Sequence, residues 1–341
     1  MKALRTVAER QVEVLDLPVP HPEPGEVVIQ MKSTGICGSD LHPYRRPTQW
    51  HLAPGSFISG HEPSGVIAEI GKDVTGWQVG DRVVPFFRRV CNRCVYCRAG
   101  LQNVCIDRRA SYGHQGCDGS HAEYMRVEAP YLMPLPEYLS FVEGAILACQ
   151  GGTAYAPLAR MGVSGRDVLV VSGLGPVGLL SVILAQAMGA TVVGIDPSPG
   201  RRAIGEKLGC VLTLDPATES LGEQLRAHFP DGADKLTETS GATSAHKVIG
   251  SLVRPRATFA LVGGGSPDLV MPLGHLGRTE ANVFGSSAYS PVQWGEITEF
   301  VHRNGVDLPS VVSETHPLAN GVEAFRIAAD ANTGKVMFRF E

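Results

Sequence analysis

The sequence predicts an α/β protein in which a β-rich domain is interrupted by a doubly wound parallel-sheet domain and then resumed. The first part of the chain holds short strand-like runs between Gly and Pro turns, at residues 12–15, 27–32, 65–71 and 82–87. From Gly165 onward, strand-like runs alternate with helical stretches, which is typical of βαβ units around a parallel sheet. After about Phe284 the pattern is mixed again. We therefore predict one domain from residues 1–150 and 286–341, and a second from residues 151–285.

The alternating part can be followed element by element. Apolar, β-branched runs predict strands at residues 167–173, 190–196, 210–215 and 257–264. Between them, longer stretches with Ala and Leu predict helices at residues 175–189 and 201–209. Strands and helices in this order favour a doubly wound sheet, which places ligands at the carboxyl ends of its strands.

Composition excludes several classes of protein. The 341 residues are 43% hydrophobic and 19% charged, as expected for a globular protein with real cores. Thirty Lys and Arg against 34 Asp and Glu leave a net charge of −4, which argues against an electrostatic nucleic-acid binder. No apolar run reaches the ~18–20 residues of a membrane span, and the N-terminus does not resemble a secretory signal. We therefore expect a cytoplasmic protein without a membrane or nucleic-acid partner.

Four of the eight cysteines lie in one short segment. Cys91, Cys94, Cys97 and Cys105 follow the spacing C-x2-C-x2-C-x7-C. Four thiolates can close a tetrahedron around Zn²⁺ and leave no position for substrate, so the spacing predicts a structural zinc in a lobe at about residues 88–108. A metal-free loop, a pair of disulfides and an iron–sulfur site are the alternatives. Four arginines flank the segment and would balance its charge: Arg88, Arg89, Arg108 and Arg109.

A glycine-rich turn joins the strand at 167–173 to the following helix. Gly173, Gly175 and Gly178 form the pattern G-x-G-x-x-G between them. Gly173 would allow a tight turn, Gly175 a close approach to a pyrophosphate, and Gly178 close packing of the helix on the sheet. The N–H groups of the helix N-terminus would face the phosphates. The predicted cofactor-binding set therefore includes the intervening residues Leu174, Pro176 and Val177.

The next strand ends at Asp196, 18 residues beyond Gly178. A carboxylate there would accept hydrogen bonds from the adenine ribose and repel a 2′-phosphate, which favours NAD. Arg201 and Arg202 follow closely, and an arginine near this point can hold a 2′-phosphate, so NADP stays open. We place Arg201 in the cofactor-binding set. A strand-end turn without a ligand is the alternative for Asp196.

Further candidate ligands are scattered along the chain. Cys37 lies in GICGSDLH, His61 and Glu62 lie in SGHEPSG, and Cys149 lies in LACQGGTAY. Taken singly, each is more typical of a core thiol or a satisfied polar residue than of a ligand. Beside a filled zinc segment and a nucleotide motif, they favour a second metal site with an open position.

These motifs resemble the zinc-dependent medium-chain dehydrogenase/reductase family, the alcohol dehydrogenases and their polyol and sugar relatives. The resemblance spans essentially the whole chain through GHEPSGVIAEIG, WQVGDRV, the four-cysteine segment, CGSD, GLGPVG and SETHPLANGVEAF. It implies a GroES-like catalytic domain built from both ends of the chain, with a Rossmann NAD(P)-binding domain between them. It also implies two zinc ions per chain and disfavours an iron–sulfur site.

The resemblance assigns the catalytic zinc. Cys37, His61 and Cys149 match its ligands, although polyol dehydrogenases often place a glutamate third, which makes Glu143 a competitor six residues before Cys149. Glu62 is implied to lie near the metal or to replace water as a fourth ligand.

The resemblance also assigns roles beside the metal. Asp40 would orient His61, Ser39 would contact the substrate alcohol, and His42 would end a proton relay through the cofactor ribose. Thr153, in CQGGTAY, belongs to the cofactor-binding set. Trp50, Tyr44 and Phe87 are candidates for the substrate cleft.

The implied activity is reversible hydride transfer between NAD and a secondary alcohol, polyol or sugar-like substrate. An NADP-dependent primary-alcohol or aldehyde reductase is the alternative. A nucleotide-binding protein without catalysis is a third hypothesis, because fold alone does not establish function. The implied partners are a small-molecule alcohol or carbonyl substrate and further copies of the chain, as a homodimer or homotetramer.

Overall fold

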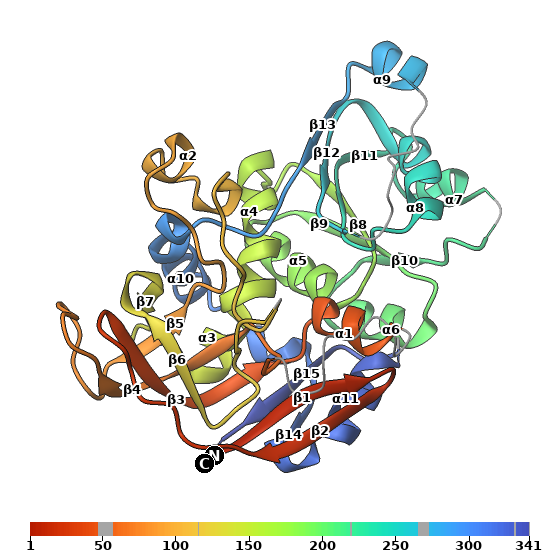
Figure 1. The fold of residues 1–341 in the computed structure, drawn as a ribbon. Helices are drawn as coiled ribbons and strands as arrows, with labels where there is room; N and C mark the ends of the chain where they lie inside the picture. Colours follow the sequence, from red (N-terminus) through yellow and green to blue (C-terminus); the bar gives the residue numbers. More distant parts are fainter. Residues whose placement is uncertain (47–56, 115, 219, 265–272, 331, 341) are drawn as a thin grey trace.

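The computed structural model describes residues 1–46, 57–114, 116–218, 220–264, 273–330 and 332–340. Two large sheets organise the chain, one in each half of the molecule, and helices pack around both (Figure 1). The predicted fold class is therefore confirmed, while the domain boundaries near residues 150 and 286 stay predictions.

The first large sheet is six-stranded and wholly parallel, in the order β10-β9-β8-β11-β12-β13. This order places β9 and β10 on one side of β8, and β11, β12 and β13 on the other, which is the doubly wound arrangement. The strands are β8 (Val168–Ser172), β9 (Thr191–Ile195), β10 (Leu212–Leu214), β11 (Ala233–Glu238), β12 (Val253–Leu261) and β13 (Asn282–Gly285).

Helices connect these strands and cover the sheet. Figure 1 shows α5 and α6 following β8 and β9, with α7 and α8 farther along the chain. The helices are α4 (Gly152–Met161), α5 (Pro176–Ala187), α6 (Pro199–Lys207), α7 (Leu221–His228), α8 (Thr243–Val248) and α9 (Leu273–Thr279). The helix predicted at 175–189 is α5, and the helix predicted at 201–209 is α6.

Strand β11 was not predicted, because Asp234 and Lys235 interrupt its apolar pattern. Both charges are paired in the fold. Lys235 Nζ lies 2.8 Å from a carboxylate oxygen of Asp167, and Asp234 forms an ion pair with Arg254. Paired charges can occupy a central strand that sequence periodicity alone would reject.

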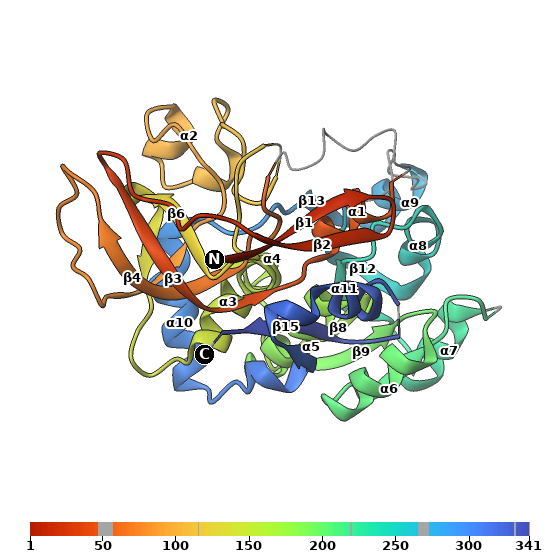
Figure 2. The same cartoon turned by 60° about the horizontal axis from the view of Figure 1, so that its bottom comes forward.

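The second large sheet draws strands from both ends of the chain. Its order is β14-β15-β3-β4-β5-β7, with β6 also paired to β3, and a separate ribbon joins β1 to β2. Its strands and the ribbon are β1 (Lys2–Ala8), β2 (Gln11–Asp16), β3 (Glu26–Gly35), β4 (Pro63–Ile70), β5 (Arg82–Pro85), β6 (Tyr124–Glu128), β7 (Leu132–Pro134), β14 (Val312–His316) and β15 (Lys335–Arg339). The C-terminal strand β15 lies beside β3, so the two ends of the chain build one sheet (Figure 2).

Shorter helices complete this half. They are α1 (Gly38–Tyr44), α2 (Val95–Arg98), α3 (Phe141–Ile146), α10 (Trp294–Arg303) and α11 (Gly321–Ala329). Short helical turns lie at η2 (Gln102–Val104), η3 (Ala129–Tyr131), η4 (Leu147–Gly151), η5 (Ile249–Leu252), η6 (Pro291–Gln293), η7 (Leu308–Val311) and η8 (Leu318–Asn320). Helices α3, η4 and α4 run without a break, and α4 contacts β11 and β12, so they link the two halves.

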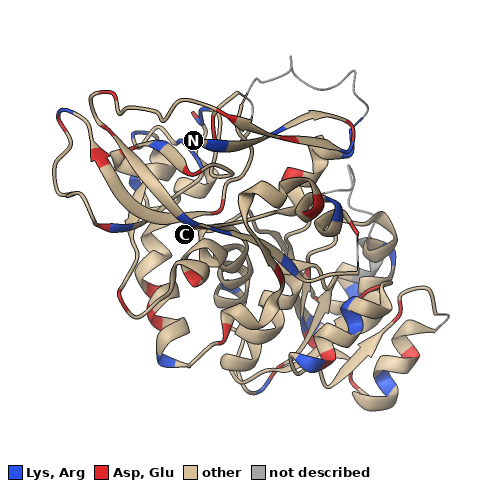
Figure 3. Cartoon of the chain, turned by 90° about the horizontal axis from the view of Figure 1, so that it is seen from below, with Lys and Arg blue, Asp and Glu red and all other residues tan. Residues whose placement is uncertain are grey.

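The charged side chains are distributed without a single-sign face. Figure 3 shows acidic and basic residues interspersed over both halves of the chain. Among the described residues, no helix is long and apolar enough to cross a bilayer.

Candidate active site and structural metal site

The four cysteines of the predicted lobe converge on one point. The sulfurs of Cys91, Cys94, Cys97 and Cys105 all lie within 4.8 Å of one another. Cys91 Sγ is 3.9 Å from Cys97 Sγ and 3.5 Å from Cys105 Sγ. Four zinc–sulfur bonds of ~2.3 Å in a tetrahedron require sulfur separations of about 3.8 Å, so the spacing suits a single zinc ion. All four thiols are free, which excludes a disulfide in this structure.

Backbone N–H groups stabilise thiolates in this lobe. The N–H of Cys94 donates to Cys91 Sγ at 3.3 Å, and the N–H of Cys97 donates to Cys94 Sγ at 3.5 Å. The second bond is the main reason that the pKa of Cys94 falls to about 6. Sulfurs this close leave room for one ion and not for a multi-iron cluster, so the donor set fits zinc.

We expect Cys94→Ser to destabilise the lobe and to halve the zinc content of a chain that holds two ions. The apparent Tm should fall by about 5 °C, because the lobe lies at the edge of the molecule and opens locally. Metal analysis and a thermal melt measure both effects. Cys117→Ser, a half-buried thiol outside both clusters, is the control and should keep the full zinc content.

A second cluster forms from distant parts of the chain. Cys37, His61, Glu62 and Cys149 bring their ligand atoms within 4.8 Å of one another. Cys37 is the N-cap of α1, and His61 and Glu62 directly precede β4. Cys149 lies in the π-helical turn η4, a distortion that recurs at functional sites. The structure thus brings together residues that lie up to 112 positions apart in sequence.

His61 is held in a fixed orientation. Its Nδ1 lies 3.1 Å from Asp40 Oδ1, and its Nε2 lies 3.2 Å from Ser39 Oγ. Burial lowers the pKa of His61, but the charges of Asp40 and Cys37 outweigh that effect and raise it well above its usual value. A carboxylate on one ring nitrogen leaves the other nitrogen to bind a metal, which is the usual environment of a histidine ligand.

The pKa values of the two cysteines of this cluster are shifted in opposite directions. A hydrogen bond from Cys149 is the main cause that lowers the pKa of Cys37, and the same bond raises the pKa of Cys149. A thiolate beside a thiol is the state that a divalent cation converts into two thiolates, with release of the proton.

Glu62 is paired with a residue that the sequence analysis did not identify. The carboxylate forms an ion pair with Lys335 at the start of β15, and both side chains are fully buried. Lys335 Nζ also donates to the carbonyl of Ile36 at 3.1 Å. Burial raises the pKa of Glu62, and Lys335 opposes that rise. Nothing in the sequence marks Lys335, since a lysine in a terminal strand is usually exposed.

Two further side chains were considered beside this cluster, Glu143 and His114. Glu143, the competitor for the third ligand, instead forms a capping box with Ser140 at the start of α3. His114 received no predicted role, yet its ring centre lies 4.7 Å from that of His61. Its ligand nitrogen also clusters with Asp40 and His61.

The glycine turn has the predicted backbone geometry. Gly173 has a φ of +93°, which favours glycine. A Cβ on Gly178 would lie 1.8 Å from the carbonyl oxygen of Gly173, so α5 could not approach β8 this closely with any larger residue. A Cβ on Gly175 would meet only the Arg201 guanidinium, whose Nη1 lies 3.8 Å away. Helix α5 starts at Pro176 without a side-chain cap, which leaves backbone donors available.

Asp196 closes the turn from the next strand. Its Oδ2 accepts from Leu174 N and its Oδ1 accepts from Ser198 N, both at 2.8 Å. Each carboxylate oxygen has a second lone pair for another donor. Arg202 is paired with Asp215 at 3.0 Å, whereas Arg201 lies beside Gly175 and donates to the Thr333 carbonyl.

Family comparisons agree with this arrangement. Residues 23–137 match the alcohol dehydrogenase GroES-like domain, and residues 176–303 match the zinc-binding dehydrogenase domain. The D-arabitol-phosphate dehydrogenase of Enterococcus avium is 30% identical over 338 residues, covering 96% of this chain and 93% of the relative. The chain belongs to the zinc-dependent medium-chain dehydrogenase family.

Two other relatives support this membership. The sorbitol dehydrogenase of Halalkalibacterium halodurans is 30% identical over 327 residues and covers 93% of each chain. The alcohol dehydrogenase of Thermus sp. ATN1 has a TM-score of 0.91 at 26% identity, covering 100% of both chains. The chain is therefore an oxidoreductase of alcohols.

The remaining candidate residues of this dehydrogenase lie in different parts of the structure. Phe87 lies beside the metal cluster, with its ring centre 5.3 Å from that of His61. Tyr44, a candidate for the substrate cleft, is buried in the core against Phe325. Trp50 lies outside the described residues. Thr153 is half-buried in the first turn of α4, and His42 is exposed on α1.

Two of the flanking arginines do not balance the thiolates of the dehydrogenase's lobe. Arg89 and Arg109 both bind Glu128, with nitrogen–oxygen distances of 2.8 and 3.5 Å. The expected charge balance is therefore wrong for these two, because Glu128 supplies their counter-ion.

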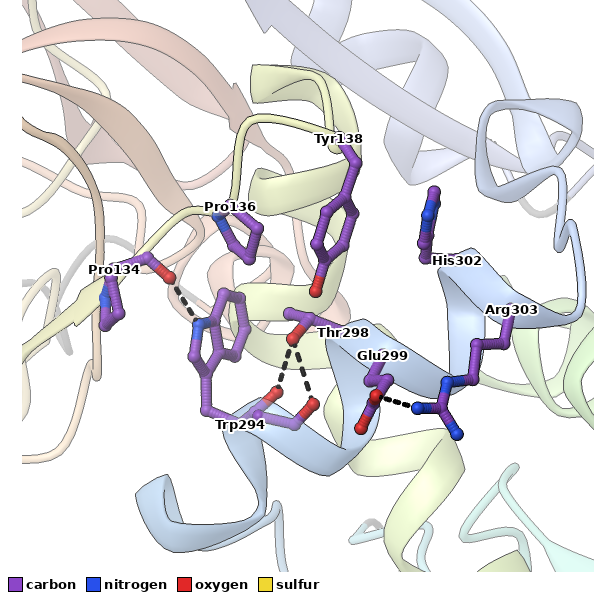
Figure 4. Close-up of a pocket in the computed structure, with 9 residues that line it drawn as sticks. Pro134, Pro136, Tyr138, Trp294, Thr298, Glu299, His302 and Arg303 are labelled. Atoms are coloured by element: carbon purple, nitrogen blue, oxygen red, sulfur yellow. Dashed lines mark hydrogen bonds and ion pairs between the residues drawn. The ribbon is translucent and has the colours of Figure 1, made fainter.

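A separate cavity of about 380 Å³ lies between α10 and the segment after β7 (Figure 4). Its polar groups already bind one another: Trp294 Nε1 donates to the Pro134 carbonyl at 2.7 Å, and Glu299 pairs with Arg303. Tyr138 stacks on His302, with ring centres 4.2 Å apart. None of its lining residues belongs to either of the two cysteine-containing clusters.

Proposed function

We propose that this chain is a cytoplasmic, zinc-dependent oxidoreductase that transfers hydride between NAD and a secondary alcohol, polyol or sugar-like substrate. The polyol class comes from the names of two relatives, sorbitol dehydrogenase and D-arabitol-phosphate dehydrogenase. The direction is reversible, because both directions share one transition state. We further propose that the protein works as a homodimer or homotetramer with two zinc ions per chain.

One observation carries the proposal. Glu62 Oε1 is buried and has no hydrogen-bond partner among the described residues, although it lies in the cluster with Cys37, His61 and Cys149. An unpaired buried carboxylate oxygen is costly, and a cation among these donors removes that cost. The donor set of two sulfurs, one imidazole and one carboxylate oxygen suits zinc.

In the proposed mechanism, Cys37, His61 and Cys149 would hold the metal, with Glu62 Oε1 as a fourth donor that substrate can replace, while Glu62 Oε2 stays paired with Lys335. Zinc there would supply Lewis-acid polarisation of an alcohol or carbonyl oxygen. Asp40 keeps His61 oriented through its hydrogen bond to Nδ1.

The proton route begins at Ser39. Its hydroxyl lies beside His61 and would accept the substrate hydroxyl proton. His42 lies three residues later on α1, where an exposed imidazole can pass that proton to water. We assign Ser39, Asp40 and His42 as the catalytic and positioning residues.

The proposed cofactor site is the glycine turn. A nicotinamide cofactor would supply the hydride acceptor. The residues that would bind it are Gly173, Leu174, Gly175, Pro176, Val177, Gly178, Asp196, Arg201 and Thr153. Arg201 is supported by its position beside Gly175, where a guanidinium would meet a pyrophosphate. NADP is the alternative cofactor.

We expect Asp196→Asn to weaken the preference for NAD over NADP by about 10–100-fold. Loss of a hydrogen bond to a charged group costs ~1.5–3 kcal/mol, and loss of the negative charge removes repulsion of the 2′-phosphate. Ratios of kcat/KM for the two cofactors measure the change. A thermal melt checks the fold, since Asp196 also binds two backbone N–H groups. An unchanged ratio would remove Asp196 from the cofactor site.

A substrate panel tests the function as a whole. Aliphatic, cyclic and polyhydroxy alcohols are assayed with NAD and with NADP, with and without a zinc chelator. We expect turnover of polyhydroxy secondary alcohols with NAD and its loss on chelation. Turnover only of primary alcohols with NADP would favour the alternative, and two bound zinc ions without any turnover would favour a non-catalytic protein.

A further inference from the structure

Arg88 places a cation beside the proposed substrate position. It follows Phe87, and its guanidinium carbon lies 5.3 Å from the centre of the Phe87 ring. That ring is itself 5.3 Å from the His61 ring. The guanidinium therefore lies only one aromatic side chain away from the proposed metal ligand. Burial lowers the pKa of Arg88, and a negative charge on Cys149 would oppose that fall.

This arginine has no counter-ion among the described residues. Its Nη1 donates to the Asn103 carbonyl at 2.5 Å, and its Nη2 donates to Ser287 Oγ at 2.9 Å. Both acceptors are neutral. A guanidinium has five N–H donors, so three have no acceptor among the residues that the structure describes. Arg108 lies close enough to lower the pKa of Arg88 by repulsion, and it also forms no ion pair in the described chain.

The neighbouring arginines differ from Arg88 in having an acidic partner. Arg89 and Arg109, on the same two chain segments, both form ion pairs with Glu128 and share its single negative charge. Arg88, by contrast, is half-buried and has no ion-pair partner among the described residues. A partly buried cation without a counter-ion is unfavourable, and an anion that fills the site removes the cost.

The four-cysteine lobe is attached to the rest of the protein without the charge of Arg88. Asn103 Nδ2 donates to the Ser287 carbonyl at 3.1 Å, and Ser290 Oγ donates to the Gly100 carbonyl at 2.6 Å. These neutral bonds already join the lobe to residues 287–290. A guanidinium adds the planar fork that binds phosphate or carboxylate with two parallel hydrogen bonds.

We propose that Arg88 binds an anionic oxygen group of the substrate, a phosphate or a carboxylate, at the end remote from the carbon that is oxidised. This inference rests on the proposed alcohol oxidoreductase function and narrows its substrate class to anionic polyols or hydroxy acids. Arg88 is a specificity-determining residue, because the reacting carbon is handled by other side chains.

The test compares matched substrates in the zinc-loaded protein. A neutral polyol, its terminal monophosphate and the hydroxy acid of the same carbon skeleton are assayed with NAD. We expect one anionic substrate to exceed the neutral one at least tenfold in kcat/KM. Arg88→Met should lower that ratio at least tenfold, through KM, and Arg88→Lys should restore part of it. Arg109→Met, which loses only the Glu128 pair, is the matched control and should keep the ratio.

Binding provides a second readout. With NADH saturating, calorimetry measures inorganic phosphate binding to the wild type and to Arg88→Met, and we expect at least a tenfold loss in the variant. A preference for phosphate or for carboxylate identifies the source of the anion, and either supports the inference. Turnover of neutral alcohols with no anionic preference, and no change in Arg88→Met, overturns the inference and leaves the proposed function standing. Absence of turnover with every substrate overturns both.

Discussion

His61→Ala is expected to lower kcat by about 10³-fold or more while leaving NAD binding intact. The imidazole is a proposed metal ligand, and Lewis-acid polarisation contributes several kcal/mol to the transition state, each ~1.4 kcal/mol being a factor of ten. The glycine turn lies in the other half of the chain, so nucleotide binding does not depend on this ring. Steady-state kinetics, NADH fluorescence titration and zinc analysis measure the three quantities.

The control separates the site from general loss of structure. His302→Ala removes an exposed imidazole of the α10 cavity and should keep full activity and two zinc ions. If His61→Ala retained wild-type turnover, the assignment of the catalytic metal would be wrong. If His61→Ala kept its zinc but lost turnover, the metal site would stand without His61 as a required ligand. His61 would then act in the chemistry itself.

Lys335→Met is expected to destabilise the protein by about 3–5 kcal/mol, the usual cost of removing one partner from a buried ion pair. Both Lys335 and Glu62 are fully buried, so no water can solvate the carboxylate that remains. Methionine retains most of the aliphatic volume, which isolates the loss of charge from the loss of packing. Urea or thermal unfolding measures the change, and Lys207→Met, an exposed lysine at the end of α6, should stay within about 0.5 kcal/mol.

A double variant tests whether the unpaired charge of Glu62 causes this loss of stability. Lys335→Met combined with Glu62→Leu removes both charges, and we expect it to recover most of the stability that the single lysine variant loses. If the double variant were as unstable as the sum of the two single variants, packing would account for the effect. The same pair also bears on activity, because Glu62 Oε1 is the donor that substrate is proposed to replace.

Local sequence was sufficient for two features. The four-cysteine lobe spans only 15 residues, so spacing alone places its sulfurs around one point. The glycine turn is equally local: the strand, the turn and helix α5 are consecutive, and Gly173 and Gly178 are required by the backbone that joins them. The doubly wound sheet follows from the alternation of strands and helices, although β11 was missed because its charges are paired only in the fold.

The cluster of Cys37, His61 and Cys149 could not be predicted from local sequence patterns alone. Cys37, His61 and Cys149 are individually ordinary, and it was the family resemblance that grouped them. The fold brings them together because β3, β4 and the α3–η4–α4 helix meet at the junction of the two halves. Glu143 shows the limit of sequence spacing, since its carboxylate caps α3 instead.

The amino-acid sequence by itself determined the elements, the zinc lobe and the nucleotide turn, because each is set by contacts between residues close along the chain. Only the tertiary structure decided that Lys335 pairs with Glu62, that His114 lies against His61, and that Arg88 has no counter-ion among the described residues. Burial and charge pairing depend on which distant segments enclose a side chain, and no local pattern encodes that enclosure.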